Sequence, residues 1–120
     1  MEYVLLLHED EKRWATMPPD QFGREMGAYA AYTTALREAG AFKEGNPLQP
    51  TPTATIVRVD AAGKTAVLDG PYAETKEQLG GYYVIDVPDL DAAISWAARC
   101  PCASTGTVEI RPVASMTAPA

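Results

Sequence analysis

The chain has 120 residues, a net charge of −6, 47% hydrophobic residues and 22% charged residues. This length and composition are typical of one globular domain that buries its own core, and they exclude a disordered chain. The acidic balance, with no basic cluster, predicts no nucleic-acid partner, because a phosphate backbone would be repelled.

The N-terminal apolar run covers only Val4–Leu7 and is followed by Glu9, Asp10 and Glu11. This run is too short for a membrane span, and it lacks the basic residues that precede the apolar part of a signal peptide. We therefore expect a cytoplasmic protein with no membrane partner.

The two cysteines, Cys100 and Cys102, and the single histidine, His8, limit the redox and metal chemistry of the chain. A disulfide between residues two apart would be strained, and these side chains are too few for a thiolate metal site. We expect reduced, structural cysteines, no metal and no cofactor.

Residues 2–8 are rich in β-formers and predict a first strand. Pro18-Pro19-Asp20 supplies the chemistry of a helix start, and Gly40 that of a helix end. Between them, apolar residues recur at spacings of three and four and predict one buried helix stripe. The stripe consists of Phe22, Met26, Tyr29, Thr33, Leu36 and Gly40.

Residues 41–53 contain several prolines and predict a loop with at most a short edge strand. Ala54–Val59 and Thr65–Leu68 are β-rich, and the intervening residues Asp60–Gly63 predict a hairpin turn. A further strand is predicted at Tyr82–Val87.

Pro88 and Asp89 predict the start of a second helix, which Pro101 ends. Its predicted buried side carries Leu90, Ala93, Ile94 and Ala97. The last strand is predicted at Thr107–Val113. We expect one domain over residues 1–113 and a flexible tail over residues 114–120.

The predicted order is β-α-β-β-α-β with a hairpin in the middle, which is the split βαβ pattern of an α+β, ferredoxin-like fold with an antiparallel sheet. Two helices can cover only one face of such a sheet. Strands 54–59 and 82–87 nevertheless carry apolar residues on both faces. We therefore expect a homodimer formed through the helix-free sheet face.

One polar stretch, Asp69-Gly70-Pro71-Tyr72-Ala73-Glu74-Thr75-Lys76-Glu77-Gln78-Leu79-Gly80-Gly81-Tyr82-Tyr83, combines a turn, a charged segment and the start of a strand. Pro71 presets its own φ for the turn. Thr75 and Gln78 stand at capping-box spacing, which predicts a single helical turn.

This stretch closely resembles the signature of the DGPF group of the YCII-related family, with Tyr72 in place of the usual Phe. The resemblance extends over about residues 1–113 and includes Met1–Leu7, Leu90–Arg99 and Val108–Val113. It implies a ferredoxin-like fold of the dimeric α/β-barrel type, and it implies no established activity.

Some members of the wider family have been proposed to use a His–Asp pair, with the His on the first helix. The matching position here is Tyr29, so that pair is absent from this chain. Tyr29 also fits the buried stripe of the predicted helix, which is the reading we prefer.

The candidate catalytic residues are Asp69, Glu74 and Lys76 of the charged segment, together with His8. Carboxylates beside a lysine can bind a polar ligand and carry acid–base chemistry, and a His beside carboxylates can act as a general base. The alternative is a turn fixed by Asp69, ordinary surface charges, and a histidine exposed at a strand end.

The candidate ligand-binding residues are Tyr72, Tyr82, Tyr83 and Arg111. Tyrosines supply stacking surfaces and hydroxyl groups. Arg111 alternates with Glu109 along the last strand, and we prefer the reading that these two form an ion pair at the dimer interface.

The sequence predicts a protein that binds a small polar or aromatic molecule in a dimer cleft, and any reaction would be acid–base chemistry without a cofactor. The alternative is a non-catalytic accessory or regulatory protein, since the resemblance implies an association with extracytoplasmic-function sigma factors. A buried carboxylate of shifted pKa in a closed pocket would favour the enzyme. A solvated charged loop would favour the interaction protein.

Overall fold

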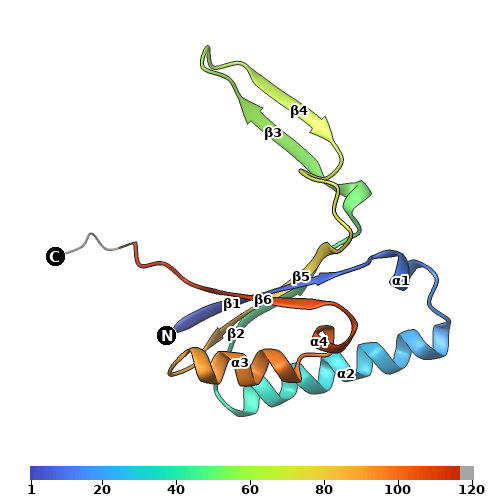
Figure 1. Cartoon of the computed structure of the whole chain (residues 1–120), viewed down its shortest axis with the longest axis vertical. Helices are drawn as coiled ribbons and strands as arrows, with labels where there is room; N and C mark the ends of the chain where they lie inside the picture. The colour runs from blue at the N-terminus through green and yellow to red at the C-terminus, as the bar shows by residue number, and fades with distance from the viewer. Residues whose placement is uncertain (117–120) are drawn as a thin grey trace.

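The computed structural model describes residues 1–116 and contains a four-stranded sheet and a separate two-stranded sheet (Figure 1). The elements, in chain order, are β1 (Glu2–Glu9), α1 (Lys12–Ala15), α2 (Pro19–Glu38), β2 (Phe42–Pro47), the 3₁₀ helix η1 (Thr51–Thr53), β3 (Thr55–Val59), β4 (Thr65–Asp69), β5 (Gln78–Asp86), α3 (Leu90–Arg99), α4 (Cys102–Thr105) and β6 (Thr107–Pro112).

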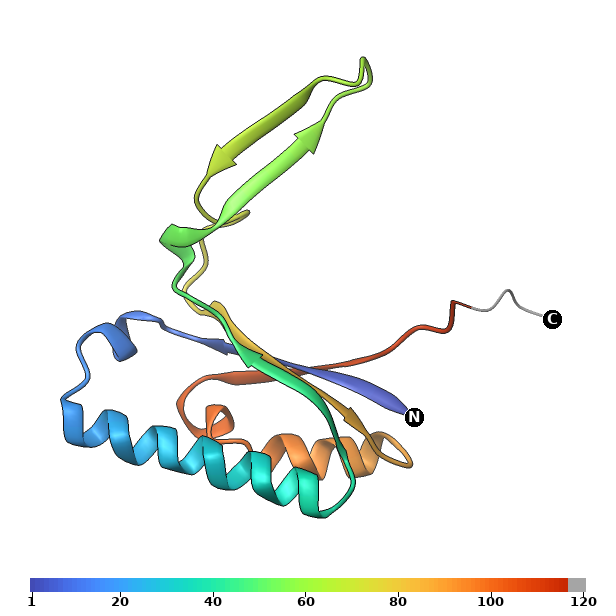
Figure 2. The ribbon, with the colours of Figure 1, turned by 180° about the vertical axis from the view of Figure 1, so that it is seen from behind.

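The larger sheet has the strand order β2-β5-β1-β6, and every neighbouring pair is antiparallel. The long helices α2 and α3 both lie on one face of this sheet (Figure 2). This arrangement confirms the predicted α+β fold with the split βαβ connection.

The core lies between the sheet and the helices, because β1, and β5 from Gly81 onward, alternate between a buried face and a more exposed face. On β1, Leu5 and Leu7 are buried, whereas Leu6 and His8 are only half-buried. The buried core comprises Tyr3, Leu5, Leu7, Tyr32, Leu36, Ala41, Tyr83, Ile85, Val87, Ala93, Ala97, Cys100 and Cys102.

The two long helices begin at the predicted signals. Pro19 occupies the first turn of α2. The Asp89 carboxylate caps α3 by accepting a 2.9 Å hydrogen bond from the Ala92 backbone N–H. The predicted stripe of α2 is only partly buried, since Phe22 and Met26 are exposed. None of the helices within the described residues is long and apolar enough to cross a membrane.

The middle of the chain differs from the prediction. The hairpin of β3 and β4 was expected inside the main sheet, yet it forms its own sheet. The strand that pairs with β5 is instead β2, a short edge strand within residues 41–53, which the prediction allowed there. Edge strands such as β2 tolerate Gly45, Asn46 and Pro47, because only one of their sides needs to pair.

The helical turn expected at Thr75 and Gln78 is not formed. The Thr75 hydroxyl donates to the Glu77 carbonyl, and the Gln78 amide donates to the Thr75 carbonyl at 2.6 Å. These bonds occupy side chains that would otherwise cap a helix, so the segment stays a series of bends. In the predicted tail, residues 114–116 have no regular structure, and residues 117–120 lie outside the described residues.

Gly106 allows the start of β6 to approach β1 closely. A Cβ atom at this position would overlap the carbonyl oxygen of His8 and lie 3.1 Å from Glu9 Cα. Gly23 on α2 differs, since a Cβ there would meet nothing within 4 Å. Substitution by alanine at these two positions should therefore have opposite effects on the free energy of unfolding.

We expect Gly106→Ala to lower the free energy of unfolding by about 2–4 kcal/mol, because two backbone segments must separate. Gly23→Ala should raise it by about 0.5–1 kcal/mol, because Ala restricts the unfolded chain and favours the helix. Urea unfolding measures both changes. Equal stabilities of the two variants would contradict the close approach of β6 to β1.

Candidate functional site

The sheet face opposite the helices is here called the open face. Its half-buried apolar centre consists of Val4, Leu6 and Val84. The strand register surrounds this centre with polar side chains. The open face consists of Glu44 and Asn46 of β2, Tyr82 and Val84 of β5, Val4, Leu6 and His8 of β1, and Thr107, Glu109 and Arg111 of β6.

His8 and Glu109 form a hydrogen-bonded pair on this face, with His8 Nε2 3.0 Å from Glu109 Oε1. The His8 side chain is 29% exposed and that of Glu109 is 44% exposed, so a ligand can reach both. The second carboxylate oxygen of Glu109 lies 3.7 Å from Arg111 Nη1. With Nε2–H donating to Glu109, a neutral imidazole has its lone pair on Nδ1.

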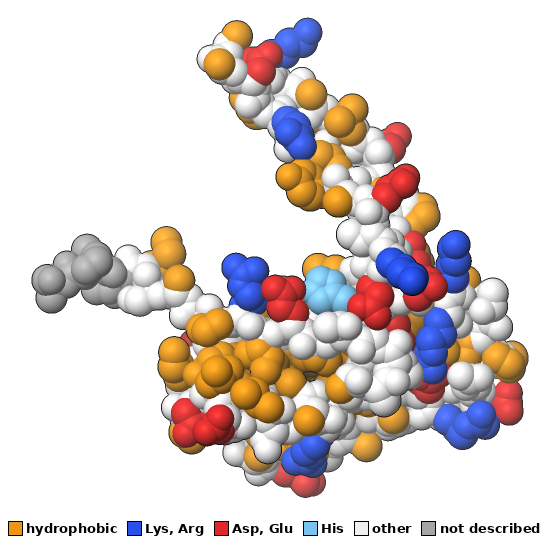
Figure 3. Space-filling model, viewed as in Figure 1, with side chains coloured by type: hydrophobic (Ala, Val, Ile, Leu, Met, Phe, Trp, Pro, Cys, Tyr) orange, Lys and Arg blue, Asp and Glu red, His pale blue; other side chains and the backbone are white. Residues whose placement is uncertain are grey.

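The charged segment contacts the neighbour of this pair on β6. Thr107, which lies opposite His8 in the register of β1 and β6, donates from its hydroxyl to Glu77 Oε1 at 2.8 Å. His8 therefore lies near carboxylates from two different parts of the chain. In Figure 3 the histidine stands in a row of acidic and basic side chains where the body meets the hairpin.

Tyr82 occupies the other side of the open face. Its hydroxyl donates to Glu44 Oε1 at 2.8 Å and accepts from Asn46 Nδ2 at 3.0 Å. Leu6 lies between Tyr82 and Glu109 in the strand register. Because paired strands are about 4.8 Å apart, Tyr82 and Glu109 flank a strip about 10 Å wide.

The structure does not bring the remaining predicted residues to this face. Asp69, Glu74 and Lys76 are exposed at the end of β4 and in the loop that follows. Tyr72 is 78% exposed, and its ring lies 5.6 Å from the guanidinium carbon of Arg58.

Tyr83 points into the core instead of toward Tyr82. It is buried, and its hydroxyl lies 3.0 Å from the Thr33 hydroxyl. Consecutive residues of a strand face opposite sides of the sheet, so one ligand cannot contact both tyrosine rings from the open face. Of the predicted candidates, the structure gathers His8, Tyr82 and Arg111.

Glu9 forms a buried polar cluster that the sequence analysis did not identify. Its carboxylate accepts hydrogen bonds from Arg13 Nη1 at 3.2 Å, Trp14 Nε1 at 3.0 Å and the Thr105 hydroxyl at 2.8 Å. The two-residue period of β1 was the available signal, because it places Glu9 on the same face as Leu7. The carboxylate has three donors and joins β1, α1 and α4.

Arg13 and Tyr29 complete the surroundings of this cluster. A hydrogen bond to Glu25, at 2.6 Å, is the main cause that raises the pKa of Arg13. Burial is the main cause that raises the pKa of Tyr29, whose ring lies 6.4 Å from that of Trp14. Tyr29 therefore remains a protonated packing residue, in agreement with the preferred reading.

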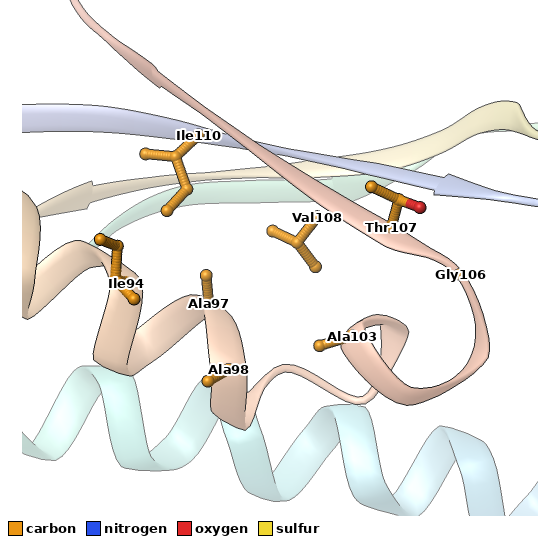
Figure 4. Close-up of a pocket in the computed structure, with 8 residues that line it drawn as sticks. All are labelled: Ile94, Ala97, Ala98, Ala103, Gly106, Thr107, Val108 and Ile110. Carbon is orange, nitrogen blue, oxygen red and sulfur yellow. The ribbon is translucent and has the colours of Figure 1, made fainter.

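A shallow apolar pocket of about 340 Å³ lies beside β6 on the helix side of the sheet (Figure 4). Apart from Thr107, whose hydroxyl is bonded to Glu77, its lining side chains are aliphatic, and none of the predicted site residues lines it. This pocket offers packing surface and no acid or base. It is lined by Ile94, Ala97, Ala98, Ala103, Gly106, Thr107, Val108 and Ile110.

Among the described residues, no group of three or more His, Cys, Asp and Glu side chains is placed to hold a metal ion. Cys100 and Cys102 are both free and buried. Burial is the main cause that raises the pKa of Cys100 to about 11 and the pKa of Cys102 to about 12.

Comparisons with known proteins agree on the family and the fold. A family model for the YCII-related domain matches residues 1–117. An uncharacterized protein of Rhizobium meliloti (strain 1021) is 40% identical over 116 residues, which cover 95% of this chain and 93% of that protein.

One solved structure has a similar fold: 5-chloro-2-hydroxyhydroquinone dehydrochlorinase from Burkholderia phenoliruptrix AC1100, in complex with 2,5-dihydroxybenzoquinone. The TM-score is 0.51, the sequence identity is 13%, and the match covers 95% of this chain and 94% of the other. At this identity the similarity concerns the fold alone.

We expect both cysteines to react at least about 100-fold more slowly than glutathione with dithionitrobenzoate at pH 8, because burial keeps them protonated and inaccessible. In denaturant both should react at the rate of a free thiol. Absorbance of the released thiolate follows the reaction. Rapid labelling of the native protein would contradict a structural role for these thiols.

Proposed function

The chain belongs to the YCII-related family, and from this premise we propose that it binds a small hydroxylated aromatic molecule on the open face, where His8 exchanges a proton with the ligand. The family supplies no activity, so the proposal rests on the site. The single observation that carries it is the accessible pair of His8 and Glu109, with Arg111 beside it.

The proposed chemistry follows from the orientation of His8. With Nε2–H held by Glu109, Nδ1 of the neutral ring can accept the proton of a phenolic hydroxyl. The Glu109 carboxylate then stabilises the imidazolium, and Arg111 stabilises the phenolate. Proton transfer of this kind requires no cofactor.

The apolar centre of the open face supports an aromatic ligand. Val4, Leu6 and Val84 form a flat floor for a ring, and the Tyr82 hydroxyl offers a polar contact at its edge. The dehydrochlorinase of similar fold binds 2,5-dihydroxybenzoquinone, a ring with acidic hydroxyl groups. This compound is therefore a suitable first probe.

The same apolar floor supports a homodimer as part of this proposal. Val4, Leu6 and Val84 are only half-buried in the single chain, and a second copy would remove them from water. The ligand would then lie in a cleft between the two copies. A cytoplasmic location stays a prediction of the sequence.

A second candidate function is favoured by the solvated state of the charged loop. Asp69, Tyr72, Glu74 and Lys76 are all exposed, which is the feature expected of an interaction protein. In this function the protein is a non-catalytic accessory protein, with a protein partner at the loop. The association with extracytoplasmic-function sigma factors, implied by the family, suggests that context.

Titration with 2,5-dihydroxybenzoquinone separates the two candidates. His8→Asn and Arg111→Met should each raise the Kd at least about tenfold, because each removes a charge-assisted hydrogen bond to the ligand. Glu74→Ala and Lys76→Ala are the matched controls, and they should leave the Kd within about twofold and the stability nearly unchanged. Isothermal calorimetry measures the binding.

Two outcomes would contradict the proposed site. If the loop variants lose binding while His8→Asn retains it, the ligand binds the charged loop. If the unmodified protein shows no binding at millimolar probe, the proposed ligand class is wrong and the accessory function gains support.

A further inference from the structure

The hairpin of β3, β4 and their turn, residues 55–69, is here called the arm. Both ribbon views show the arm projecting from the body on the side of the open face (Figures 1 and 2). The radius of gyration is 16.9 Å, whereas a compact chain of this length has about 14 Å. A single copy therefore leaves the arm away from the core.

One face of the arm carries three exposed valines. Val57 and Val67 lie directly opposite each other in the register, and Val59 follows on the same side. Val57 is 60% exposed, Val67 is 61% exposed and Val59 is 62% exposed. They form what we call the valine face. Asp69 also belongs to this face, because it pairs with Thr55, which lies on the same side of β3 as Val57.

The other face of the arm is partly covered by the chain itself. Arg58 lies over the ring of Tyr72 at 5.6 Å. Ile56, on this second face, is only half-exposed, in contrast to the valines. Leu68, which pairs with Ile56, is 56% exposed, so this second face is covered only in part, whereas the three valines are each at least 60% exposed.

Hydrogen bonds at the base of the arm set its direction. The Glu11 carboxylate accepts from the Thr51 backbone N–H at 2.9 Å and from its hydroxyl at 2.5 Å, and the Glu11 N–H donates to Gln78 Oε1 at 2.9 Å. These bonds hold the base to the body but bury none of the valines. A two-stranded hairpin alone is only marginally stable in water, so its apolar face requires a partner.

A second copy of this chain is the occupant that the charges and surfaces favour. The arm carries two acidic and two basic residues (Asp60, Asp69, Arg58 and Lys64) within a chain of net charge −6, so it can approach an acidic body without repulsion. The open face supplies a matching apolar surface. The arm and the body of one copy meet at an angle that is open to solvent (Figure 1). A two-fold axis would place a second copy, with its own arm, in the same relation to the first.

The area of contact also favours engagement of the arms. Four strands about 4.8 Å apart and about 20 Å long give about 760 Å² for two stacked open faces, less than the roughly 1,000 Å² of a specific interface. Two arms, each about 17 Å by 10 Å, add about 340 Å² of arm surface and raise the total to about 1,100 Å². Stacking of the open faces alone buries too little area for a specific interface, and the arms supply the additional area.

We propose that each arm docks, valine face inward, on a second copy of this chain and closes that copy's open face, so that the site at His8 is complete only in the dimer. Asp69 is then presented to the second copy, which accounts for its distance from His8 within one chain. The closing of the site rests on the proposed function, whereas the contact of the arm does not.

Sedimentation equilibrium tests the contact of the arm. Val57→Thr with Val67→Thr keeps shape and strand propensity but places hydroxyls in the interface, and it should raise the dimer Kd at least about tenfold. Ile56→Thr with Leu68→Thr, the neighbouring cross-strand pair on the other face, is the matched control and should change it less than about threefold. An unmodified protein that remains monomeric, or equal effects of the two pairs, would overturn the proposal.

Mixing two defective variants tests whether the arm acts on the second copy. Neither His8→Asn nor the Val57→Thr, Val67→Thr variant should bind 2,5-dihydroxybenzoquinone tightly alone. A mixture should restore about one tight site in four, because half of the dimers then combine an intact His8 with an intact arm from the other copy. No restoration, when the unmodified protein binds the probe, would overturn closure by the partner's arm.

The two tests distinguish this inference from the proposed function. If the unmodified protein does not bind the probe, the proposed function fails. The sedimentation result then decides the contact of the arm by itself.

Discussion

The side chains of β1 alternate between the two faces of the sheet, and pairing with β5 and β6 fixes which face each one occupies. The rest of the structure depends on this constraint. Leu5 and Leu7 are 0% and 8% exposed beneath the helices, while His8 faces the open side. A slip of one residue would exchange the two faces and bury His8. Pairing with β6 also fixes the position of Glu109, since Leu6 opposes Glu109 and His8 opposes Thr107.

The end of β1 shows how this constraint links the core to the site. The pairing with β5 shifts between Leu7 and His8, whereas the pairing with β6 continues without a shift. His8 thus keeps its neighbours on β6 when the β5 side becomes irregular. The next residue, Glu9, is held by donors from α1 and α4, which fixes the strand end from below.

Local chemistry made much of the fold predictable from the sequence. Asp89 caps α3 as its position before an apolar run indicated. The turn of the arm forms where Gly63 adopts a positive φ of 82°, and the Asp60 carboxylate accepts from two backbone N–H groups. Both features depend on residues that are close in sequence.

The features that could not be predicted from the sequence depend on pairing between residues far apart in the chain. Strand β2 has weak β-formers and exists because β5 offers it a free edge. The arm has the alternating branched residues of a sheet strand, which is why the sequence predicts it inside the main sheet. His8 and Glu109 are 101 residues apart, and only the register of β1 against β6 brings them together.

The open face and the arm are two apolar surfaces that one copy leaves exposed. Contact with a second copy would bury both of them. A crystal structure of the protein with bound 2,5-dihydroxybenzoquinone would test this claim most directly. We expect a ring on Val4, Leu6 and Val84, with a hydroxyl oxygen at hydrogen-bond distance from His8 Nδ1, beneath the arm of a second copy. A ligand elsewhere, or a dimer whose arms remain in solvent, would contradict it.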